Sequence, residues 1–303
     1  MTGATFDMRR RDGFSLIELT ITIAITGVVA VGLANLLQHP MEARAAVTRR
    51  AELVALGDVA LGRMVDDIES ALPRSVRVGG GGSALELMRV SAAGPYRAVA
   101  GVNDPGGPGE QDHSDVGDLL SLANDTSFNV LGRLSPQPIA YGASFASGTR
   151  IAVAPASATT LWRDAARSRN PGSITPSGTR LSLFDDADED QLRLSRAHTF
   201  SAASPNTRFH LVEGPVTWVC DARDEAIWRV DAYAMQRRQP TNRRRSPLSR
   251  GNVARAADLV ERCTFGYVAG PADRGGLVTI ELVLESGGER VRHARSVQVR
   301  HAP

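Results

Sequence analysis

The sequence predicts an α+β protein in which a long N-terminal helix, half of it in a membrane and half amphipathic, packs on a head rich in antiparallel β-strands. Three observations lead to this prediction. A run of apolar or small residues, broken by a single formal charge, covers residues 14–37, and an amphipathic helical pattern covers residues 41–72. Short segments of β-forming residues, separated by glycine and proline, then recur through residues 73–303, as is typical of β-hairpins.

The apolar run is long enough to cross a membrane. At about 1.5 Å per residue, a helix over residues 14–37 would reach about 36 Å, against about 30 Å for a bilayer core. A cleavable secretory signal would be shorter and would end at a small-residue cleavage site. A plain anchor gives no reason for Glu18, the only formal charge in the run, because an intramembrane carboxylate is costly and marks a functional residue. The alternative is that Glu18 lies at the membrane interface.

The start of this run carries a recognisable motif. Residues 13–19 read Gly-Phe-Ser-Leu-Ile-Glu-Leu and follow a basic leader, and the stretch resembles the processing signal of type IV pilins and type II secretion pseudopilins. The resemblance implies that a prepilin peptidase removes residues 1–13 by cutting after Gly13, and that Phe14 is then N-methylated. It also implies that Glu18 pairs with the N-terminal amine of a neighbouring subunit and sets the register of the filament. Such a pair at about 4 Å is worth about 4 kcal/mol before desolvation.

The orientation in the membrane does not follow from charge alone. Three arginines precede the run, and three, Arg44, Arg49 and Arg50, follow it closely, so the positive-inside comparison is a tie. The chain has two cysteines, Cys220 and Cys263, and two cysteines outside the cytoplasm form a disulfide more often than a metal site. Together with the resemblance, this favours a single-pass protein of the bacterial inner membrane with its C-terminal domain in the periplasm.

The amphipathic segment is expected to continue the helix beyond the membrane. Pro40 predicts a kink or break, after which apolar residues recur every seven positions at Val47, Val54, Leu61 and Ile68. Charged residues, Asp67 among them, are assigned to the other faces. We expect the apolar stripe to pack on the protein's own sheet, with a short coiled coil as the alternative, and Pro73 to end the helix.

The head is expected to consist of strands joined by turns and two long loops. The strands are predicted at residues 75–78, 84–90, 96–99, 128–134, 150–154, 180–184, 191–194, 209–213, 215–220, 226–234, 253–260, 263–267, 277–285 and 289–299. Loops are predicted at residues 101–118 and 236–250, where glycine, proline and polar residues gather, with a short helical turn near residues 115–122. The rest of residues 155–206 shows no clear pattern.

An acidic tract in the head is a weak candidate for a metal site. Asp186, Asp188 and Asp190 alternate like the start of a calcium loop. However, Gln191 stands where that loop needs glycine, and Ala197 where it needs a bidentate glutamate. A solvated turn is therefore the preferred interpretation, and a metal site the alternative.

The second long loop contains an arginine cluster formed by Arg237, Arg238, Arg243, Arg244 and Arg245. Such a cluster could hold nucleic acid, but it has no interleaved aromatic residues, so a solvated loop is preferred. The six histidines are not spaced as metal ligands, and no nucleophile elbow, zinc-protease or phosphate-loop motif is present. We expect a non-catalytic protein without a cofactor, and we do not expect nucleic acid as a partner.

The C-terminal third of the sequence resembles one particular family of minor pilins. The strings at residues 211–221, 263–267 and 276–282 are similar to the MshO family of minor pilins, from the mannose-sensitive haemagglutinin (MSHA) pilus system. This implies a Cys220–Cys263 disulfide, a role in initiating or capping the pilus, and contacts with major and minor pilins and an inner-membrane assembly platform. One alternative is a minor pseudopilin of type II secretion. Another is a pilus-tip binding module for glycans or DNA, which would need tryptophans exposed beside arginines: Trp162, Trp218 or Trp228.

Overall fold

The computed structural model describes residues 13, 15–99, 118–135, 137–186, 188–270 and 275–299. The chain divides into two compact units, Met1–Glu52 and Leu53–Pro303. Helix α1 (Leu16–Glu69) begins in the first unit and ends in the second. Its assignment continues through Pro40, so the helix does not break where the sequence analysis allows a break. One proline removes a single N–H donor, and the turns on either side keep theirs.

The first unit contains the membrane-spanning candidate. Among the described residues, one helical segment, Leu16–Leu33, is long and apolar enough to cross a bilayer. Its threonines donate hydrogen bonds within the helix, Thr20 Oγ1 to the carbonyl of Ile17 at 2.8 Å and Thr22 Oγ1 to that of Leu19 at 2.9 Å. These hydroxyl groups therefore already have hydrogen-bond partners within the helix, which they need in a bilayer because lipid tails offer none.

In the second unit, α1 packs on the sheets of the head, as expected. Its buried apolar residues are Leu53, Ala60, Leu61, Met64 and Ile68. The predicted stripe is partly wrong, because Val54 is 40% exposed. The buried face follows the true helical period, about 3.6 residues per turn, and so includes Asp67, which is only 6% exposed.

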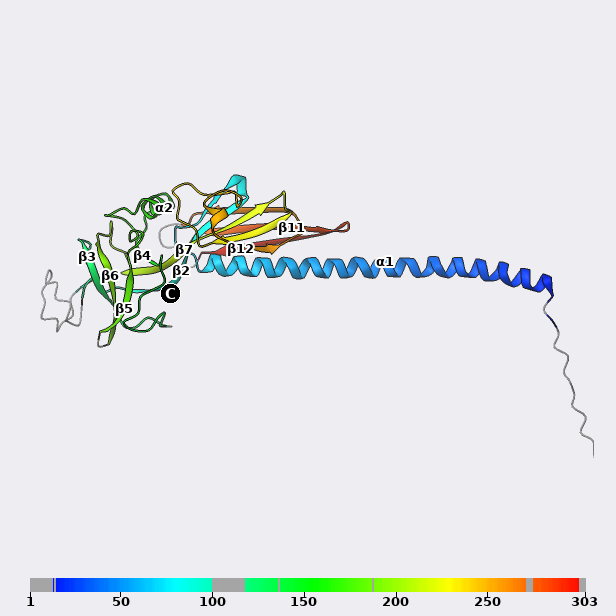
Figure 1. Ribbon diagram of the computed structural model, residues 1–303, viewed down its shortest axis with the longest axis horizontal. Helices are drawn as coiled ribbons and strands as arrows, with labels where there is room; N and C mark the ends of the chain where they lie inside the picture. The colour runs from blue at the N-terminus through cyan, green and yellow to red at the C-terminus, as the bar shows by residue number, and fades with distance from the viewer. Residues whose placement is uncertain are drawn as a thin grey trace, which may run out of the picture. The chain divides into compact units, whose positions relative to one another are not determined.

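The largest sheet has six antiparallel strands in the order β1-β2-β7-β8-β9, with β4 also paired to β7. Its strands are β1 (Arg77–Gly79), β2 (Ala84–Pro95), β4 (Arg150–Val153), β7 (Arg208–Asp221), β8 (Ala226–Asp231) and β9 (Asn252–Ala257). Strand β7 is its centre, since β2, β4 and β8 all pair with it (Figure 1).

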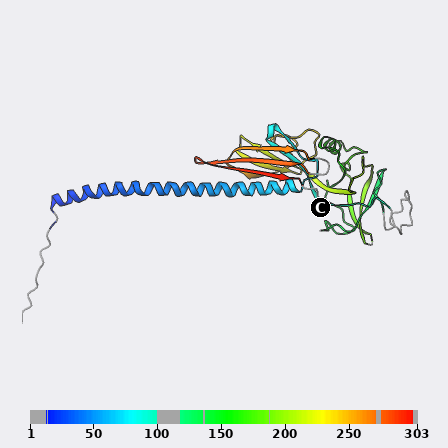
Figure 2. The same cartoon turned by 180° about the vertical axis from the view of Figure 1, so that it is seen from behind.

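The described residues of the head also form two three-stranded antiparallel sheets. One consists of β10 (Val260–Val268), β11 (Leu277–Ser286) and β12 (Glu289–Gln298). It lies along the C-terminal part of α1, as Figure 2 shows, and shares one hydrophobic core with it and with the large sheet. The other consists of β3 (Asp125–Val130), β6 (Glu189–His198) and β5 (Leu181–Asp186), and packs against β4 and β7 through a second core.

Two expected strand breaks are absent. Strand β7 passes through Gly214 and Pro215, which pair with Arg89 and Met88 of β2. The register of β2 against β7 shifts next to these pairs, and Gly214 has a φ of 153°, so the Gly-Pro pair marks an irregularity within one strand. Likewise β2 continues to Pro95, and beyond it Tyr96 makes only an isolated bridge.

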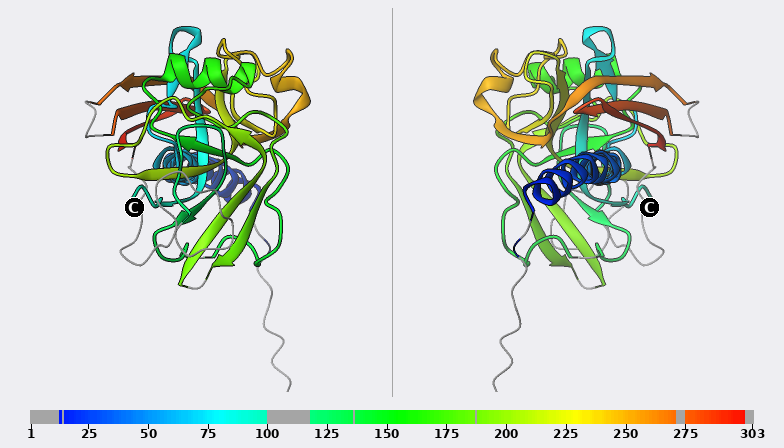
Figure 3. Two further views of the ribbon diagram at one scale, coloured as in Figure 1. Left: turned by 90° about the vertical axis from the view of Figure 1, so that its left-hand side faces the viewer. Right: turned by 90° about the vertical axis from the view of Figure 1, so that its right-hand side faces the viewer.

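Helix α2 (Ala158–Arg167) is an element that the sequence analysis does not predict. The Ser157 hydroxyl caps it by accepting a hydrogen bond from the N–H of Thr160. Its buried face, which includes Trp162, packs on the large sheet, and the indole of Trp162 donates to the carbonyl of Ser75 at 2.8 Å. The guanidinium of Arg77 on β1 lies over the ring of Trp162, 3.9 Å from its centroid, so α2 lies next to the start of the β1–β2 hairpin (Figure 3). Short 3₁₀ turns occur at Gly80–Gly82 and Leu248–Arg250.

The predicted fold class is confirmed: an apolar N-terminal helix is followed by a large region rich in antiparallel β-sheet. The predicted loop at residues 101–118 falls almost entirely outside the described residues. The helical turn expected near 115–122 is wrong over residues 118–122, which are described and form no helix: the N–H of Ser121 bonds to the Asp125 side chain and that of Ala123 to the Ser121 hydroxyl instead of to helical carbonyls. Residues 236–250 contain no strand, as expected for a loop, and end in the 3₁₀ turn at Leu248–Arg250.

Candidate functional site

The candidate processing segment lies at the start of α1. Gly13 and Ser15 are exposed and precede the helix, whose first turn is held by a hydrogen bond from the N–H of Leu19 to the carbonyl of Ser15 at 3.0 Å. Phe14, the predicted methylation site, lies outside the described residues. Gly13 thus stands just ahead of a helix that a cut at this position would leave whole.

Glu18 occupies the first turn of α1. The helix N-terminus carries a partial positive charge, which favours a carboxylate there. The side chain is exposed, and the described part of the chain provides no hydrogen bond or ion pair for it. In a membrane or a packed filament, an ionised carboxylate needs a cation nearby. Glu18 is therefore placed where a cation from another molecule could pair with it.

The two cysteines form a disulfide, with their Cα atoms 5.8 Å apart. Cys220 belongs to β7 and Cys263 to β10, so the bond joins the large sheet to the β10–β11–β12 sheet. This confirms the pairing that the resemblance implies. A sequence separation of 43 residues corresponds to about 4 kcal/mol of stabilisation in the loop-entropy account.

The acidic tract is a turn between two paired strands. Asp186 pairs in register with Glu189, and Asp185 with Asp190. Asp190 is buried and accepts hydrogen bonds from the N–H of Leu134 and the hydroxyl of Tyr141, both at 2.8 Å. Asp186 accepts a hydrogen bond from Asn129 at 2.7 Å. The carboxylates are thus directed to protein donors, and among the described residues no group of three His, Cys, Asp or Glu side chains is placed to hold a metal.

The arginine-rich loop is tied to the head at its beginning. The guanidinium of Arg77 on β1 donates to the carbonyls of Gln236 and Arg237 at 2.9 and 2.8 Å. The same guanidinium forms an ion pair with the buried Glu86 at 2.6 Å. The hydroxyl of Tyr233 also donates to Glu86, at 2.8 Å. Burial raises the pKa of the Glu86 carboxyl, although the charge of Arg77 opposes the shift.

Part of the positive charge of this loop is neutralised. Arg243 and Arg244 both form ion pairs with Asp221, the last residue of β7, and with Asp224 in the turn between β7 and β8. The Arg243 guanidinium also lies over the ring of Trp228, 4.0 Å from its centroid, and Arg255 lies 5.2 Å from it. A loop whose arginines are paired in this way has fewer free charges to offer a phosphate backbone.

The tryptophans bear on the binding-module alternative. Trp162 and Trp218 are buried and serve the core, and Trp228 is partly exposed. The indole of Trp218 donates to Asp67 at 3.0 Å. Only Trp228 therefore combines some exposure with neighbouring arginines among the described residues.

Comparison with known proteins adds one finding. Residues 8–34 match a family model described as the prokaryotic N-terminal methylation motif. No curated protein and no solved structure matches the chain significantly. The match supports a type IV pilin-like prepilin: a structural protein that is processed by a prepilin peptidase and assembles with pilin machinery. Combined with the apolar helix, it indicates a single-pass membrane anchor.

Proposed function

We propose that this protein is a minor pilin of an MSHA-type type IV pilus, which helps to initiate or cap the filament. The observation that carries the proposal is the methylation motif at residues 8–34, which leads directly into the apolar helical segment Leu16–Leu33. A soluble binding protein needs neither feature. A retained apolar helix, by contrast, serves first as a membrane anchor and then as the core of a filament.

The proposed maturation has three steps. A prepilin peptidase cuts after Gly13 on the cytoplasmic side of the inner membrane, and the new N-terminus at Phe14 is methylated. Methylation keeps the amine cationic, so it can pair with Glu18 of a neighbouring pilin in the filament. The head stays in the periplasm during assembly, where other pilins and the inner-membrane platform meet it.

The assignment to the MSHA branch rests on the C-terminal strings. They fall on β7, β10 and β11, the strands that carry the disulfide and much of the shared core. A resemblance in these strands concerns the architecture of the head rather than a variable loop. The N-terminal helix is common to pilins and pseudopilins and cannot separate them. The resemblance in the head strands therefore supports the MshO-like assignment.

Deletion of the gene tests this proposal against the alternative of a minor pseudopilin of type II secretion. The measurements are the number of surface pili, by electron microscopy, and the amount of secreted enzymes in the medium. Loss of pili with normal secretion, restored by the wild-type gene, is the expected result. Loss of secretion with normal pili would reject the proposal and favour the pseudopilin.

A pilus-tip binding module for glycans or DNA is the second alternative, and the position of Trp228 favours it. The ring is partly exposed and has Arg243 and Arg255 near it, a combination found in the stacking surfaces that bind bases or sugars. The pairing of Arg243 with two aspartates weighs against DNA. Normal pilus numbers in the deletion strain, together with lost adhesion, would support this alternative.

A further inference from the structure

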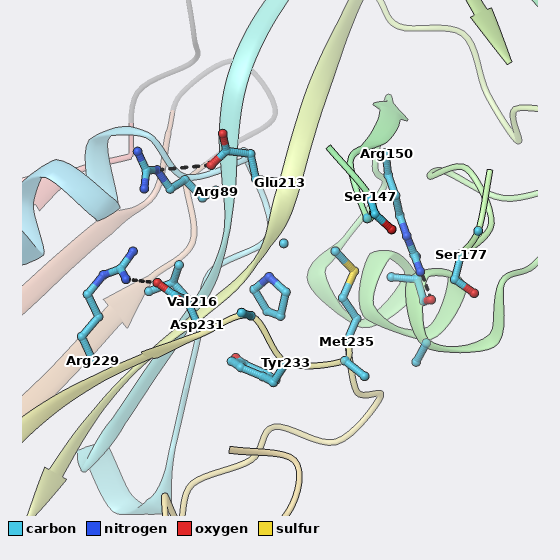
Figure 4. A pocket seen from close by; sticks show the side chains of 18 residues that line it. Arg89, Ser147, Arg150, Ser177, Glu213, Val216, Arg229, Asp231, Tyr233 and Met235 are labelled. Carbon is cyan, nitrogen blue, oxygen red and sulfur yellow. Dashed lines mark hydrogen bonds and ion pairs between the residues drawn. The ribbon is translucent and has the colours of Figure 1, made fainter. Parts of the chain in front are cut away.

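A pocket with a volume of about 570 Å³ opens in the head, within the second unit (Figure 4). Its wall is formed by the start of β4, the end of α2, the middle of β7 and the segment that follows β8. Neither the methylation motif nor the disulfide involves this pocket. Its volume is enough for a small molecule the size of a sugar.

The charge of Arg150 dominates one side of the pocket. The residue is only 8% exposed, and its Nη1 donates to the carbonyl of Ala165 at 2.9 Å. No carboxylate lies within ion-pair distance of it in the part of the chain that the structure describes. Burial lowers the pKa of Arg150, but an arginine stays charged in proteins. The fold thus keeps a buried cation without an anionic partner, which is costly.

A structural role accounts for part of this arrangement. Ala165 lies in the last turn of α2, whose carbonyls carry the negative end of the helix dipole and lack partners within the helix. Arg150 caps this end. The cap, however, uses one of the five N–H donors of the guanidinium. A planar guanidinium with its remaining donors free binds a carboxylate better than any other side chain does.

The opposite side of the pocket has a different character. Glu213 lies 3.8 Å from Arg89, and Asp231 pairs with Arg229. Figure 4 shows these pairs across the pocket from Arg150, with Ser147 and Ser177 on the same side as Arg150. Carboxylates held in ion pairs still have lone pairs that accept hydrogen bonds from hydroxyl groups. Val216, next to Asp231, and Met235, on the side of Arg150, add apolar surface to the lining.

We propose that this pocket binds a sugar acid: a small molecule with one carboxylate, held by Arg150, and several hydroxyl groups, held by the serines and by the acids on the opposite side. Among the described lining residues Arg150 is the one cation without an ion pair, so the pocket suits a ligand with a single negative charge, and a neutral sugar leaves Arg150 without an anion. The proposal goes beyond the assembly role and does not depend on which filament the protein enters.

The test is calorimetric titration of the full-length protein in detergent with galacturonate, galactose and propionate. Galactose has the hydroxyls without the carboxylate, and propionate has the carboxylate without the hydroxyls. We expect saturable binding of galacturonate, at least tenfold tighter than that of either control compound. R150Q should weaken it about 10- to 100-fold, the range for a charge-assisted hydrogen-bond pair. R167Q should leave it unchanged, because Arg167 lies on the same helix end, exposed and outside the pocket lining.

A second variant separates binding from the capping role. Ala166 is exposed and lines the pocket, so A166E places a carboxylate near Arg150 and leaves the Arg150–Ala165 hydrogen bond in place. This variant should fold and should also lose galacturonate binding. Absence of galacturonate binding in the wild type, equal binding of galacturonate and propionate, or unchanged binding in A166E would overturn the proposal.

Discussion

Asp67 of α1 and Arg229 of β8 form a two-point ion pair inside the head, with Nε–Oδ2 and Nη2–Oδ1 distances of 2.7 and 3.1 Å. The indole of Trp218 on β7 donates to the same carboxylate. One acid of the helix thereby binds two adjacent strands of the large sheet. The pairing raises the pKa of Arg229, chiefly through the hydrogen bond to Asp67. Asp67 is thus the polar contact that positions this helix on this sheet.

Replacing Asp67 should destabilise the head markedly. D67A leaves the indole of Trp218 and part of the Arg229 charge buried without a partner. Removing one member of a buried pair costs about 3–5 kcal/mol, and we expect about 3 kcal/mol because Asp231 still pairs with Arg229. Urea unfolding of the full-length protein in detergent, followed by tryptophan fluorescence, measures the change. D66A is the matched control, since Asp66 is its exposed neighbour. Equal losses in the two variants would contradict this role.

An alanine at Gly57 should force the side chain of His293 to move, although alanine normally favours the middle of a helix. A Cβ atom built there would come within 2.2 Å of Nε2 of His293 on β12. G57A should therefore lower the free energy of unfolding by about 1–3 kcal/mol through overpacking. Gly62 lies five residues further along α1 with nothing within 4 Å of its Cβ position, so G62A should raise stability by about 0.5–1 kcal/mol.

Thermal unfolding of the wild type, G57A and G62A under the same conditions measures both changes in stability. The structure predicts shifts of opposite sign from the same chemical change in the same helix. Shifts of the same sign would contradict the prediction that the His293 side chain packs against Gly57 and leaves no room for a methyl group.

Asp125 should make the stability of the head depend on pH. Burial raises the pKa of its carboxyl to about 7. Hydrogen bonds from the N–H groups of Ser127 and Ser121 oppose this increase, and the negative charge of Asp118 adds to it. The folded state then holds a proton that the unfolded state has lost above about pH 4. The free energy of unfolding therefore falls as the pH rises from about 4 to 7, by at most about 4 kcal/mol, and is level above that range.

The variant D125N isolates this effect, because asparagine does not titrate. We expect the stability of D125N relative to the wild type to increase between about pH 5 and 7 and then to level off, whatever the offset at pH 5. The pKa of His198 is lowered by its own burial, but His198 is present in both proteins, so its titration cancels in the difference. A difference that does not change with pH would show that Asp125 titrates normally.

The sequence predicts the features that depend on local pattern. The apolar run, the motif at Gly13–Leu19 and the alternation of β10, β11 and β12 are visible residue by residue, and the fold class follows from them. Other features depend on pairing between distant segments. The Gly214–Pro215 pair has the composition of a turn, yet β2 pairs on both sides of it and keeps β7 continuous. The ten-residue helix α2 depends on the sheet that its short apolar face covers.

The charged residues of the head show the same limit. Asp67 has the helical spacing of the buried face, three residues after Met64, and a strict 3.6-residue period would have placed it there. A seven-residue repeat counted from Val47 hides it. Arg150 has no such signal, because its distinguishing property is the lack of a nearby carboxylate, and this depends on which distant segments surround it.

Glu18 provides the sharpest test of the proposed assembly. The Glu18→Val variant should still be cut after Gly13, because the cleavage motif around the glycine is otherwise intact, and should still insert in the membrane. Without the carboxylate, however, no charge remains to pair with the N-terminal amine of the neighbouring subunit, so incorporation into pili should fall at least tenfold. Cleavage is followed by the mobility of the mature chain and by N-terminal sequencing, and incorporation by immunodetection in sheared pili.

The control is Thr22→Val, one helical turn further along. It also replaces a polar side chain by an apolar one of similar size, but the Thr22 hydroxyl is already bonded to the carbonyl of Leu19 within its own helix. This variant should be cleaved and incorporated normally. If Glu18→Val entered pili as well as Thr22→Val does, the carboxylate would have no role in the register. If both variants failed to enter, polarity of the helix surface in general would matter, and the specific pairing with the Phe14 amine would be rejected.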